Sequence, residues 1–464
     1  MADTIVLVVL DSVRYDIFED YLNEASGTFL STLATDSVSF DRAVTPAPWS
    51  LPAHASMFTG KYPREHGATN ADTAIHPQIP TLLTRLGDAG YRTGCFTSNP
   101  FVHPDYGFEG WDHHRNNYSE KIYEKGGAPE SDEAGIGELV DGARQVISHQ
   151  HTFRTFVNAT YRKLRTGPSL VDDGGRRMVT DAVNWLSEDD SDSFVFLNFM
   201  ETHDYHRRLS RWGRIKNIAE NGRLSELNSR VGGAGIQYYA GNSTIDETDR
   251  EFYRKVMRDE IGYVDKLLQQ FWRALERQER AEDCLFVLCA DHGEGLGEGD
   301  IVYHLAGVTE PLVRVPLFVR SPDQQDGRIE RWSSLVWIYD TICREIGIDT
   351  GLTLLEESTY PDLVGSENTN RLQDLLGEID GDVSDQYLQK RVAVYQAADR
   401  DHKSVRLEDT YERRKLGSGL TEWTVDGDAR ALVDQFEDSL EVTDETHMDV
   451  DDATRSRLED FGYL

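Results

Sequence analysis

Four short apolar runs in the sequence each end at polar side chains, and this pattern most constrains the fold. The runs span 5–10, 93–97, 194–200 and 284–290. Continuous apolar runs of this length suit strands that are covered on both faces, as in a parallel sheet. Amphipathic stretches with helical spacing lie between them, at 81–89, 176–186 and 253–275. This alternation of strand and helix predicts an open α/β sheet.

The polar residues that follow these runs are of types that bind metals and catalyse reactions. Asp11 follows the first run, Asn99 the second, His203 the third, and the pair Asp291 and His292 the fourth. In open α/β sheets, ligands bind beyond the carboxyl ends of the strands. We therefore expect these side chains to gather at one edge of the sheet.

The rest of the chain predicts a further strand at 315–319, a helix at 333–348 and then a smaller α+β subdomain. Short β-type runs at 392–395, 403–407 and 422–425 and a late helix at 452–461 indicate that subdomain. We expect a catalytic domain over 1–325 and the C-terminal subdomain over 326–464. Polar, irregular stretches at 113–170 and 204–250 are candidates for shaping a substrate pocket over the sheet edge.

The charge balance argues against a nucleic-acid-binding surface. The chain has 48 Lys and Arg against 82 Asp and Glu, for a net charge of −34. A phosphate backbone requires a basic face, so we expect no nucleic-acid partner. Strong acidity with scarce lysine indicates instead a solvated shell in a salt-rich cytoplasm, as in a halophilic protein of archaeal type.

Neither the cysteines nor the N-terminus predicts an exported protein. The four cysteines form no metal-type pair and no disulfide framework. The N-terminus lacks a basic segment, and its apolar run is too short for a signal peptide or a membrane span. We therefore expect a cytoplasmic protein with no membrane span.

The segment 46–60 contains a serine among residues that commonly begin and end a helix. Ser50 stands where an N-cap would fall, Pro52 lies in the first turn, and Gly60 is a plausible stop. The field at a helix N-terminus favours the alkoxide of a hydroxyl there and any bound anion. Taken alone, the segment favours an ordinary serine cap.

Taken with its surroundings, this segment resembles the nucleophile motif of the sulfatase family, within the alkaline phosphatase superfamily. That motif has the form Cys/Ser-x-Pro-x-Arg-x-x-Leu-x-Thr-Gly, and the chain reads Ser-Leu-Pro-Ala-His-Ala-Ser-Met-Phe-Thr-Gly from Ser50 to Gly60. Further matches in the same order are the strand before Asp11, Gly-Tyr-Arg-Thr at 90–93, the strand before His203, Asp-His-Gly at 291–293 and the segment 310–316. The resemblance covers residues 4 to about 350.

The resemblance implies an alkaline-phosphatase-like fold: a mostly parallel central sheet flanked by helices. It also implies one divalent metal ion, either Ca, Mn, Mg or Zn, because carboxylate and imidazole ligands suit such ions. Carried over by position, the metal ligands are Asp11, Ser50, Asp291 and His292. His203 and His304 fall at positions that contact the transferred group or protonate the leaving group. Asn99, His54 and Arg14 are the candidate substrate-binding residues, although a surface ion pair is an equal alternative for Arg14.

Several positions depart from the sulfatase pattern. Ser12 stands where sulfatases have a second Asp, and His292 stands where Asn is common. His54 replaces the Arg on which conversion of the nucleophile to formylglycine relies, and His304 replaces a Lys. With these changes the chain resembles more closely the phosphoesterases and phosphoglycol transferases of the superfamily, which use an unmodified Ser or Thr. We therefore favour an unmodified Ser50 over its formylglycine form.

The resulting hypothesis is a metal-dependent hydrolase that cleaves sulfate or phosphate esters through a covalent intermediate on Ser50. The ester is that of a small molecule, a glycan or a lipid. One alternative is a phosphoglycol-type transferase acting on a glycan or lipid acceptor. Another is a non-catalytic binding protein. The oligomeric state is left open by the sequence.

Overall fold

The computed structural model describes residues 2–116, 174–203, 218–232, 235–324, 326–369, 387–416, 423–424 and 427–448. Its centre is an eight-stranded sheet with the strand order β13-β2-β12-β8-β1-β7-β5-β6. The strands are β1 (Thr4–Leu10), β2 (Val38–Phe40), β5 (Arg92–Thr97), β6 (His113–Asn116), β7 (Ser193–Phe199), β8 (Cys284–Ala290), β12 (Leu317–Arg320) and β13 (Gly327–Ile329).

The sheet is mostly parallel, as the sequence predicts. β1 pairs in parallel with both β7 and β8, and β5 pairs in parallel with β7 and β6. β12 runs antiparallel to both of its neighbours. Every residue of β1, β7 and β8 is buried, which explains why their sequences are continuous apolar runs rather than alternating ones.

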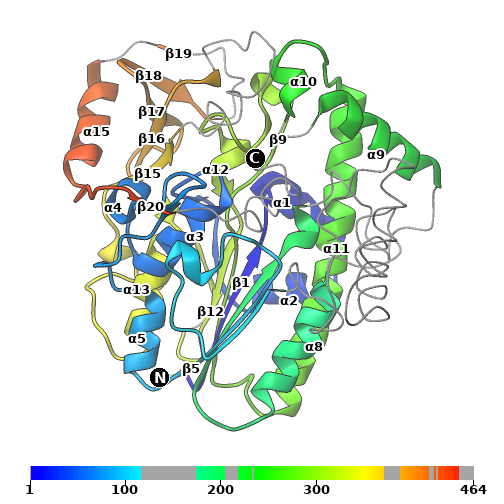
Figure 1. The fold of residues 1–464 in the computed structure, drawn as a ribbon, viewed down its shortest axis with the longest axis vertical. Coiled ribbons are helices and arrows are strands. Elements are labelled where there is room, and N and C mark those ends of the chain that lie inside the picture. The colour runs from blue at the N-terminus through cyan, green and yellow to red at the C-terminus, as the bar shows by residue number, and fades with distance from the viewer. Residues whose placement is uncertain are drawn as a thin grey trace, which may run out of the picture.

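Helices cover both faces of this sheet (Figure 1). One face carries α3 (Ser50–Thr59), α5 (Leu82–Asp88) and α13 (Trp337–Glu345). The other carries α1 (Tyr15–Glu24), α2 (Phe29–Thr35), α8 (Gly175–Leu186) and α11 (Glu247–Arg277). The predicted helices at 81–89, 176–186 and 253–275 thus correspond to α5, α8 and the central part of α11.

The predicted helix at 333–348 is wrong at its start. Residues 333 and 334 form β14 (Ser333–Ser334), which pairs with β3 (Ala43–Val44) before α13 begins. β11 (Arg314–Val315) pairs with the other edge of β3. The predicted strand at 315–319 is likewise divided at Pro316, which has no N–H to donate to a sheet ladder.

A second, five-stranded antiparallel sheet lies in the C-terminal part of the chain. Its strands are β15 (Leu363–Asn368), β16 (Arg391–Gln396), β17 (His402–Leu407), β18 (Thr410–Lys415) and β19 (Trp423–Thr424). α15 (Gly427–Asp438), which the sequence pattern did not predict, packs on this sheet. The predicted helix at 452–461 lies outside the described residues. Because β13 and α13 follow position 325 yet pack with the central sheet, the division into 1–325 and 326–464 stays a prediction.

The two parts are joined by buried polar contacts and by a returning strand. Lys403 of β17 donates to the carbonyl oxygen of Val308 and to Glu310, each at 2.7 Å. Arg64 bridges the carboxylates of Glu367 and Glu437. β20 (Thr446–His447) pairs with β4 (Thr73–Ala74), which follows the helix region of Ser50. The C-terminal sheet is therefore fixed to the part of the chain that contains the eight-stranded sheet.

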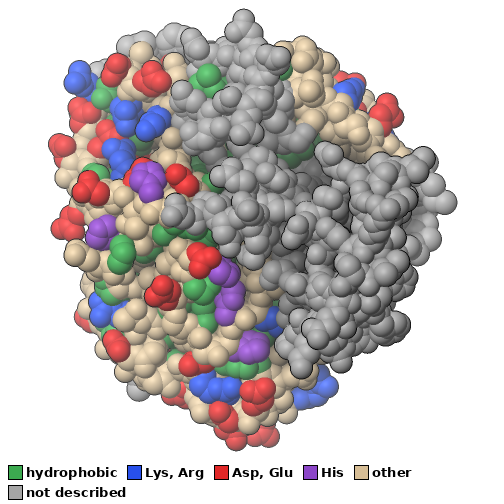
Figure 2. Space-filling model, in the orientation of Figure 1, with side chains coloured by type: hydrophobic (Ala, Val, Ile, Leu, Met, Phe, Trp, Pro, Cys, Tyr) green, Lys and Arg blue, Asp and Glu red, His purple; other side chains and the backbone are tan. Residues whose placement is uncertain are grey.

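The surface reflects the composition. On the face drawn in Figure 2, acidic side chains are spread among basic ones rather than gathered in one patch. Among the described residues, no helix is both long enough and apolar enough to cross a bilayer.

Candidate active site and metal centre

Strand register brings two aspartates together at one edge of the sheet. Leu10 of β1 lies opposite Ala290 of β8, so Asp11 and Asp291 follow at the same level. Asp11, Asp291 and His292 are fully buried, and each offers a ligand atom within 4.8 Å of the others. The predicted gathering of polar side chains at the carboxyl ends of the strands is therefore present for these three.

The two oxygens of Asp291 have different environments. Oδ1 accepts hydrogen bonds from the backbone N–H groups of Ser12, at 3.1 Å, and His292, at 2.9 Å. Oδ2 is buried and accepts no hydrogen bond from the described residues. A buried carboxylate oxygen without a donor is costly unless a cation takes that place. One oxygen thus orients the carboxylate, and the other fits a metal ion.

His292 is held in the tautomer that a metal requires. Its Nδ1 lies 2.9 Å from the carbonyl oxygen of Gly293, which can only accept, so Nδ1 carries the proton and Nε2 keeps its lone pair. Nε2 faces the aspartates, 3.8 Å from Asp11 Oδ1 and 3.5 Å from Asp291 Oδ2. Burial lowers the pKa of His292 to about 3, so the ring is neutral at neutral pH.

Asp11 lies in a site that disfavours its charge when no cation is bound. Burial, and then the nearby charge of Asp291, raise the pKa of Asp11 above its ordinary value. A divalent cation would remove that penalty and hold both carboxylates ionised. Two carboxylates and one neutral imidazole make a ligand set that suits Zn²⁺ or Mn²⁺.

Ser50 is the first residue of α3 and points its hydroxyl at His292. The N-cap is Trp49, which has extended backbone angles, so the prediction of Ser50 as the N-cap is wrong by one position. The hydroxyl oxygen of Ser50 lies 3.3 Å from His292 Nε2. Two ligand atoms on one tetrahedral zinc ion are roughly 3.3 Å apart, given bond lengths of about 2.0–2.1 Å. Gly60 ends the helix in the left-handed region, as predicted.

His54 lies next to Ser50 on α3. One turn after Ser50, its Nδ1 is 2.8 Å from the carbonyl oxygen of Ser50 and 3.6 Å from Asp291 Oδ2. The ring is fully buried and packs edge-on against Phe196 of β7. In the described structure His54 therefore contacts the backbone of Ser50 and lies close to the carboxylate of Asp291. Its substrate-binding role stays a prediction.

Asn99 contacts the metal cluster through Asp11. Its amide Nδ2 donates to Asp11 Oδ2 at 2.9 Å, and its Oδ1 accepts from the backbone N–H of Phe101. These two bonds fix which way the amide faces. Contact of Asn99 with a substrate stays a prediction.

The imidazole rings of His292, His304 and His203 lie next to one another. The ring centre of His304 lies 4.4 Å from that of His292 and 5.5 Å from that of His203. His304 and His203 are both buried. His304 also contacts the carboxylate of Glu294, with Nδ1 at 3.1 Å from Oε2. The sequence analysis missed Glu294, although an acidic residue directly after Asp-His-Gly at a strand end was a visible signal.

The guanidinium of Arg14 is paired with carboxylates of the protein. Its guanidinium makes two bonds of 2.9 Å to Asp16 and one of 2.8 Å to Glu298. Burial acts to lower the pKa of Arg14, but these two carboxylates outweigh it and raise the pKa. The predicted substrate contact of Arg14 stays a prediction; the described contacts are ion pairs.

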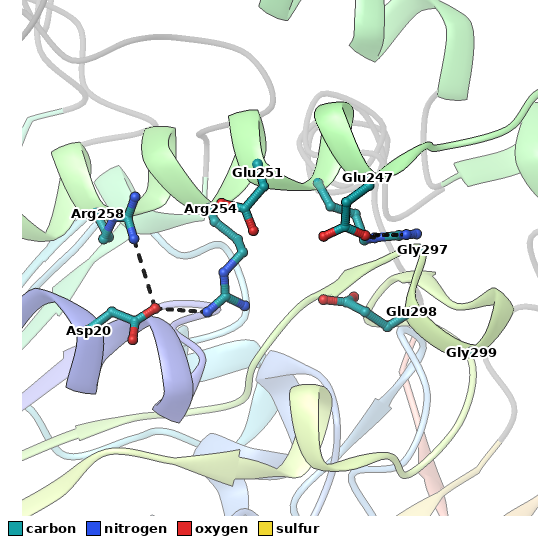
Figure 3. Close-up of a pocket in the computed structure, with 9 residues that line it drawn as sticks. Asp20, Glu247, Glu251, Arg254, Arg258, Gly297, Glu298 and Gly299 are labelled. Carbon is teal, nitrogen blue, oxygen red and sulfur yellow. Dashed lines mark hydrogen bonds and ion pairs between the residues drawn. The ribbon is translucent and has the colours of Figure 1, made fainter. Parts of the chain in front are cut away.

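A cavity of about 540 Å³ lies between α1, α11 and the loop 297–299 (Figure 3). Arg254 and Arg258 reach across it to Asp20, and Glu298, which holds Arg14, also lines it. Asp11, Ser50, Asp291 and His292 are not among the described residues that line this cavity. It is therefore separate from the candidate metal centre.

Comparisons with known proteins identify the family of the chain. A family model described as Sulfatase matches residues 3–348. The choline-sulfatase of Rhizobium meliloti (strain 1021) is 24% identical over 336 residues, which cover 68% of this chain and 62% of that protein. An uncharacterized sulfatase of Escherichia coli (strain K12) is 22% identical over 363 residues, covering 73% of this chain and 64% of that protein. The chain thus spans less than two thirds of the length of these relatives.

Solved structures share the fold at low identity. A phosphonate monoester hydrolase of Agrobacterium radiobacter superposes with a TM-score of 0.63 at 17% identity, covering 94% of each chain. A 2-O GAG sulfatase superposes with a TM-score of 0.63 at 14% identity, covering 98% of this chain and 96% of the other. These likenesses establish the architecture and leave the substrate to be argued from the site.

Proposed function

The chain belongs to the sulfatase family, and from that premise we propose that it is a metal-dependent hydrolase of sulfate or phosphate esters with Ser50 as its nucleophile. The observation that carries the proposal is the position of the Ser50 hydroxyl, 3.3 Å from His292 Nε2 beside two buried aspartates. Asp11, Ser50, Asp291 and His292 would hold the metal ion. Bound there, the ion would lower the pKa of the hydroxyl and offset charge on the ester oxygens.

The residues of the chain then divide the reaction in two steps. In the first, Ser50 Oγ forms a bond to the sulfur or phosphorus of the ester, and the bond to the leaving oxygen breaks with its electron pair on that oxygen. His304 or His203 supplies the proton that the leaving alcohol needs. In the second, water forms a bond to the same sulfur or phosphorus, the bond to Ser50 Oγ breaks, and Ser50 regains from that water the proton that its hydroxyl lost in the first step. We expect the N-terminus of α3 to favour negative charge near Ser50, and the amide of Asn99, which donates to Asp11, to hold that carboxylate in place.

We further propose that Ser50 acts as an unmodified serine. His54 occupies the position of the Arg on which formylglycine conversion relies, and its ring is fully buried against the Ser50 carbonyl. An unmodified Ser50 together with an Asp-His metal pair makes phosphate esters and sulfate esters equally good candidate substrates. A bound imidazole favours Zn²⁺ or Mn²⁺ over Ca²⁺ or Mg²⁺.

The test combines the mass of the protein with its turnover. Protein from its native host is digested, and the peptide containing Ser50 is weighed; formylglycine would be about 2 Da lighter than serine. In parallel, the protein loaded with Zn²⁺ or Mn²⁺ is assayed on matched sulfate and phosphate monoesters and phosphodiesters. We expect an unmodified peptide and metal-dependent turnover. A peptide about 2 Da lighter would overturn the unmodified serine, and no turnover in any class would overturn the hydrolase.

The transferase alternative predicts a different product. If an acceptor alcohol clears the intermediate, adding glycerol or a sugar should divert the transferred group from inorganic anion to a new ester. We expect hydrolysis to dominate, with most of the group released as inorganic sulfate or phosphate. Predominant transfer at millimolar acceptor would favour the phosphoglycol-type transferase.

A further inference from the structure

A short β-hairpin brings Glu294 against His304. β9 (Gly295–Leu296) pairs antiparallel with β10 (Val302–Tyr303), and Tyr303 lies opposite Gly295. Glu294 and His304 flank that last pair. Nδ1 of His304 lies 3.1 and 3.3 Å from the two carboxylate oxygens of Glu294. Both side chains are buried, Glu294 fully and His304 to all but 3%.

The backbone of the hairpin is constrained at the residues next to this pair. A Cβ on Gly295 would lie 2.6 Å from the carbonyl oxygen of Ile301 and 2.8 Å from that of Tyr303, so only glycine allows the approach. Tyr303, directly before His304, has a φ of 57°, a left-handed conformation that is costly for tyrosine. Strained backbone of this kind persists where the surrounding structure determines it, and it clusters at functional sites.

A third contact fixes the same segment. The hydroxyl of Tyr239 donates to the carbonyl oxygen of Val302 at 2.5 Å and accepts from the N–H of Val302 at 3.2 Å. Both polar groups of the residue two places before His304 are therefore held by one side chain. The backbone that carries His304 is thus fixed by the strand directly before it, and that of Glu294 by the strand directly after it.

The chemistry of the contact assigns the two ring nitrogens. An ionised carboxylate only accepts hydrogen bonds, so Nδ1 of His304 must donate to Glu294, whether the ring is neutral or cationic. Nε2 is then the other ring nitrogen, and in the cationic ring it also carries a proton. The ring lies between those of His292 and His203, at 4.4 and 5.5 Å between ring centres.

We propose that Glu294 is a positioning residue, which holds His304 so that Nε2 hydrogen-bonds to and protonates the leaving oxygen of the ester. This inference rests on the proposed function. When the bond from sulfur or phosphorus to the leaving oxygen breaks, the electron pair stays on that oxygen and the proton comes from Nε2 of the cationic ring; the neutral ring that remains keeps its Nδ1 proton, hydrogen-bonded to Glu294. The arrangement matters most for basic leaving groups, so it suits esters of alkyl alcohols rather than activated aryl esters.

The test compares Glu294→Gln and Glu294→Ala with the wild-type chain, each loaded with the same metal. kcat and KM are measured over a series of esters whose leaving alcohols range from nitrophenols to simple alkyl alcohols. For Glu294→Ala we expect kcat to fall about 100-fold on alkyl esters and less than about 5-fold on nitrophenyl esters, with KM nearly unchanged. Glu294→Gln should recover part of the loss, because its amide oxygen can still accept from Nδ1–H.

A matched control separates this effect from loss of a buried carboxylate in general. Glu367 is also buried, on β15, and its carboxylate pairs with Arg64. Glu367→Gln should lower the melting temperature while leaving the ratio of kcat on alkyl to nitrophenyl esters unchanged. An equal fall of kcat on every leaving group in the Glu294 variants, or no fall on alkyl esters, would overturn the proposal.

A second readout does not depend on turnover. In protein labelled with ¹⁵N-histidine, the His304 ring is assigned by its loss in His304→Gln, and the nitrogen that carries the proton is identified. We expect Nδ1–H in the wild type and a change in Glu294→Ala. If no ester is turned over but this result holds, the proposed function fails while the contact stands. If the wild-type ring carries its proton only on Nε2, the positioning role of Glu294 fails.

Discussion

The hydroxyl oxygen of Ser50 lies 3.3 Å from Nε2 of His292, although 242 positions separate the two residues in the chain. The contact exists because α3 begins one residue after an extended Trp49, and because β8 ends at the level where β1 ends. A serine used as a cap would turn its hydroxyl to its own helix. Here the hydroxyl faces the candidate metal cluster instead.

Replacing that hydroxyl should remove catalysis and spare the fold. We expect Ser50→Ala to lower kcat by about 10⁴-fold or more, because the nucleophile is lost, while bound metal measured by elemental analysis remains substantial on the other three ligands. Ser56→Ala is the matched control on the same helix. Ser56 hydrogen-bonds His66 at 3.0 Å, so its loss should lower stability but leave kcat within about threefold. Full activity of Ser50→Ala would remove Ser50 from the mechanism.

Asp11→Asn should change stability in opposite directions with and without metal. Burial and the charge of Asp291 raise the pKa of Asp11, so replacing the carboxylate with a neutral amide should stabilise the metal-free protein. With Zn²⁺ or Mn²⁺ bound, the same change removes a ligand and should weaken metal binding by at least about 10-fold. The melting temperatures of the variant and the wild type, measured once in chelator and once with the metal, test both expectations.

Asp265→Asn is the control for this reversal. Asp265 is also buried, but its carboxylate accepts from the hydroxyl of Tyr21 and the N–H of Leu30. We expect it to lower the melting temperature under both conditions. A fall of the same size for Asp11→Asn in chelator and in metal would contradict a metal centre at Asp11.

The sequence predicted the strands of the site well because each strand leaves a signal in a short stretch of consecutive residues. β1, β7 and β8 are apolar on both faces and parallel, so each run is visible in the sequence and the residue after it must lie at the shared edge. Asp11 and Asp291 could therefore be placed together in advance. The family resemblance then supplied Ser50, whose contact with His292 no periodicity reveals.

The Glu294–His304 contact could not be predicted in the same way. It depends on a hairpin whose strands have two residues each and on a left-handed Tyr303. Two residues are too few to show an alternating pattern. For Arg14 an ion pair was one of the two alternatives, but its partner Glu298 could not be named, because the two residues are 284 positions apart. Long-range polar contacts of this kind follow from the tertiary fold alone.

Salt should stabilise the protein if the net charge of −34 acts as a solvated shell. Repulsion among carboxylates at the surface is screened as ionic strength rises, with a Debye length falling from about 10 Å at 0.1 M to about 3 Å at 1 M. We expect the melting temperature to rise by several degrees between 0.1 and 1 M KCl and to rise further towards 3 M. Sucrose at matched osmolality is the control. A melting temperature that does not change with KCl would refute the halophilic interpretation.

Acid should destabilise the fold through His66, which lies outside the metal cluster. Its Nδ1 accepts the N–H of Ala68 at 3.1 Å, so the neutral ring keeps its proton on Nε2, next to the hydroxyl of Ser56. Burial lowers the pKa of His66 to about 3. An unfolded histidine has a pKa near 6.5, so the unfolded state binds the proton first as the pH falls. The stability is therefore fully present above about pH 6.5 and is lost progressively towards pH 3.

His66→Asn isolates this contribution, because the amide oxygen can accept from Ala68 but does not titrate. We expect the variant to be less stable than the wild type at pH 7.5. The difference should shrink by up to about 1.4 kcal/mol per pH unit between pH 6.5 and 4.5. Urea unfolding at four pH values measures it, and contributions from other groups, His292 among them, cancel between the two proteins. Free energies of unfolding that run parallel with pH would show that His66 is not kept neutral by burial.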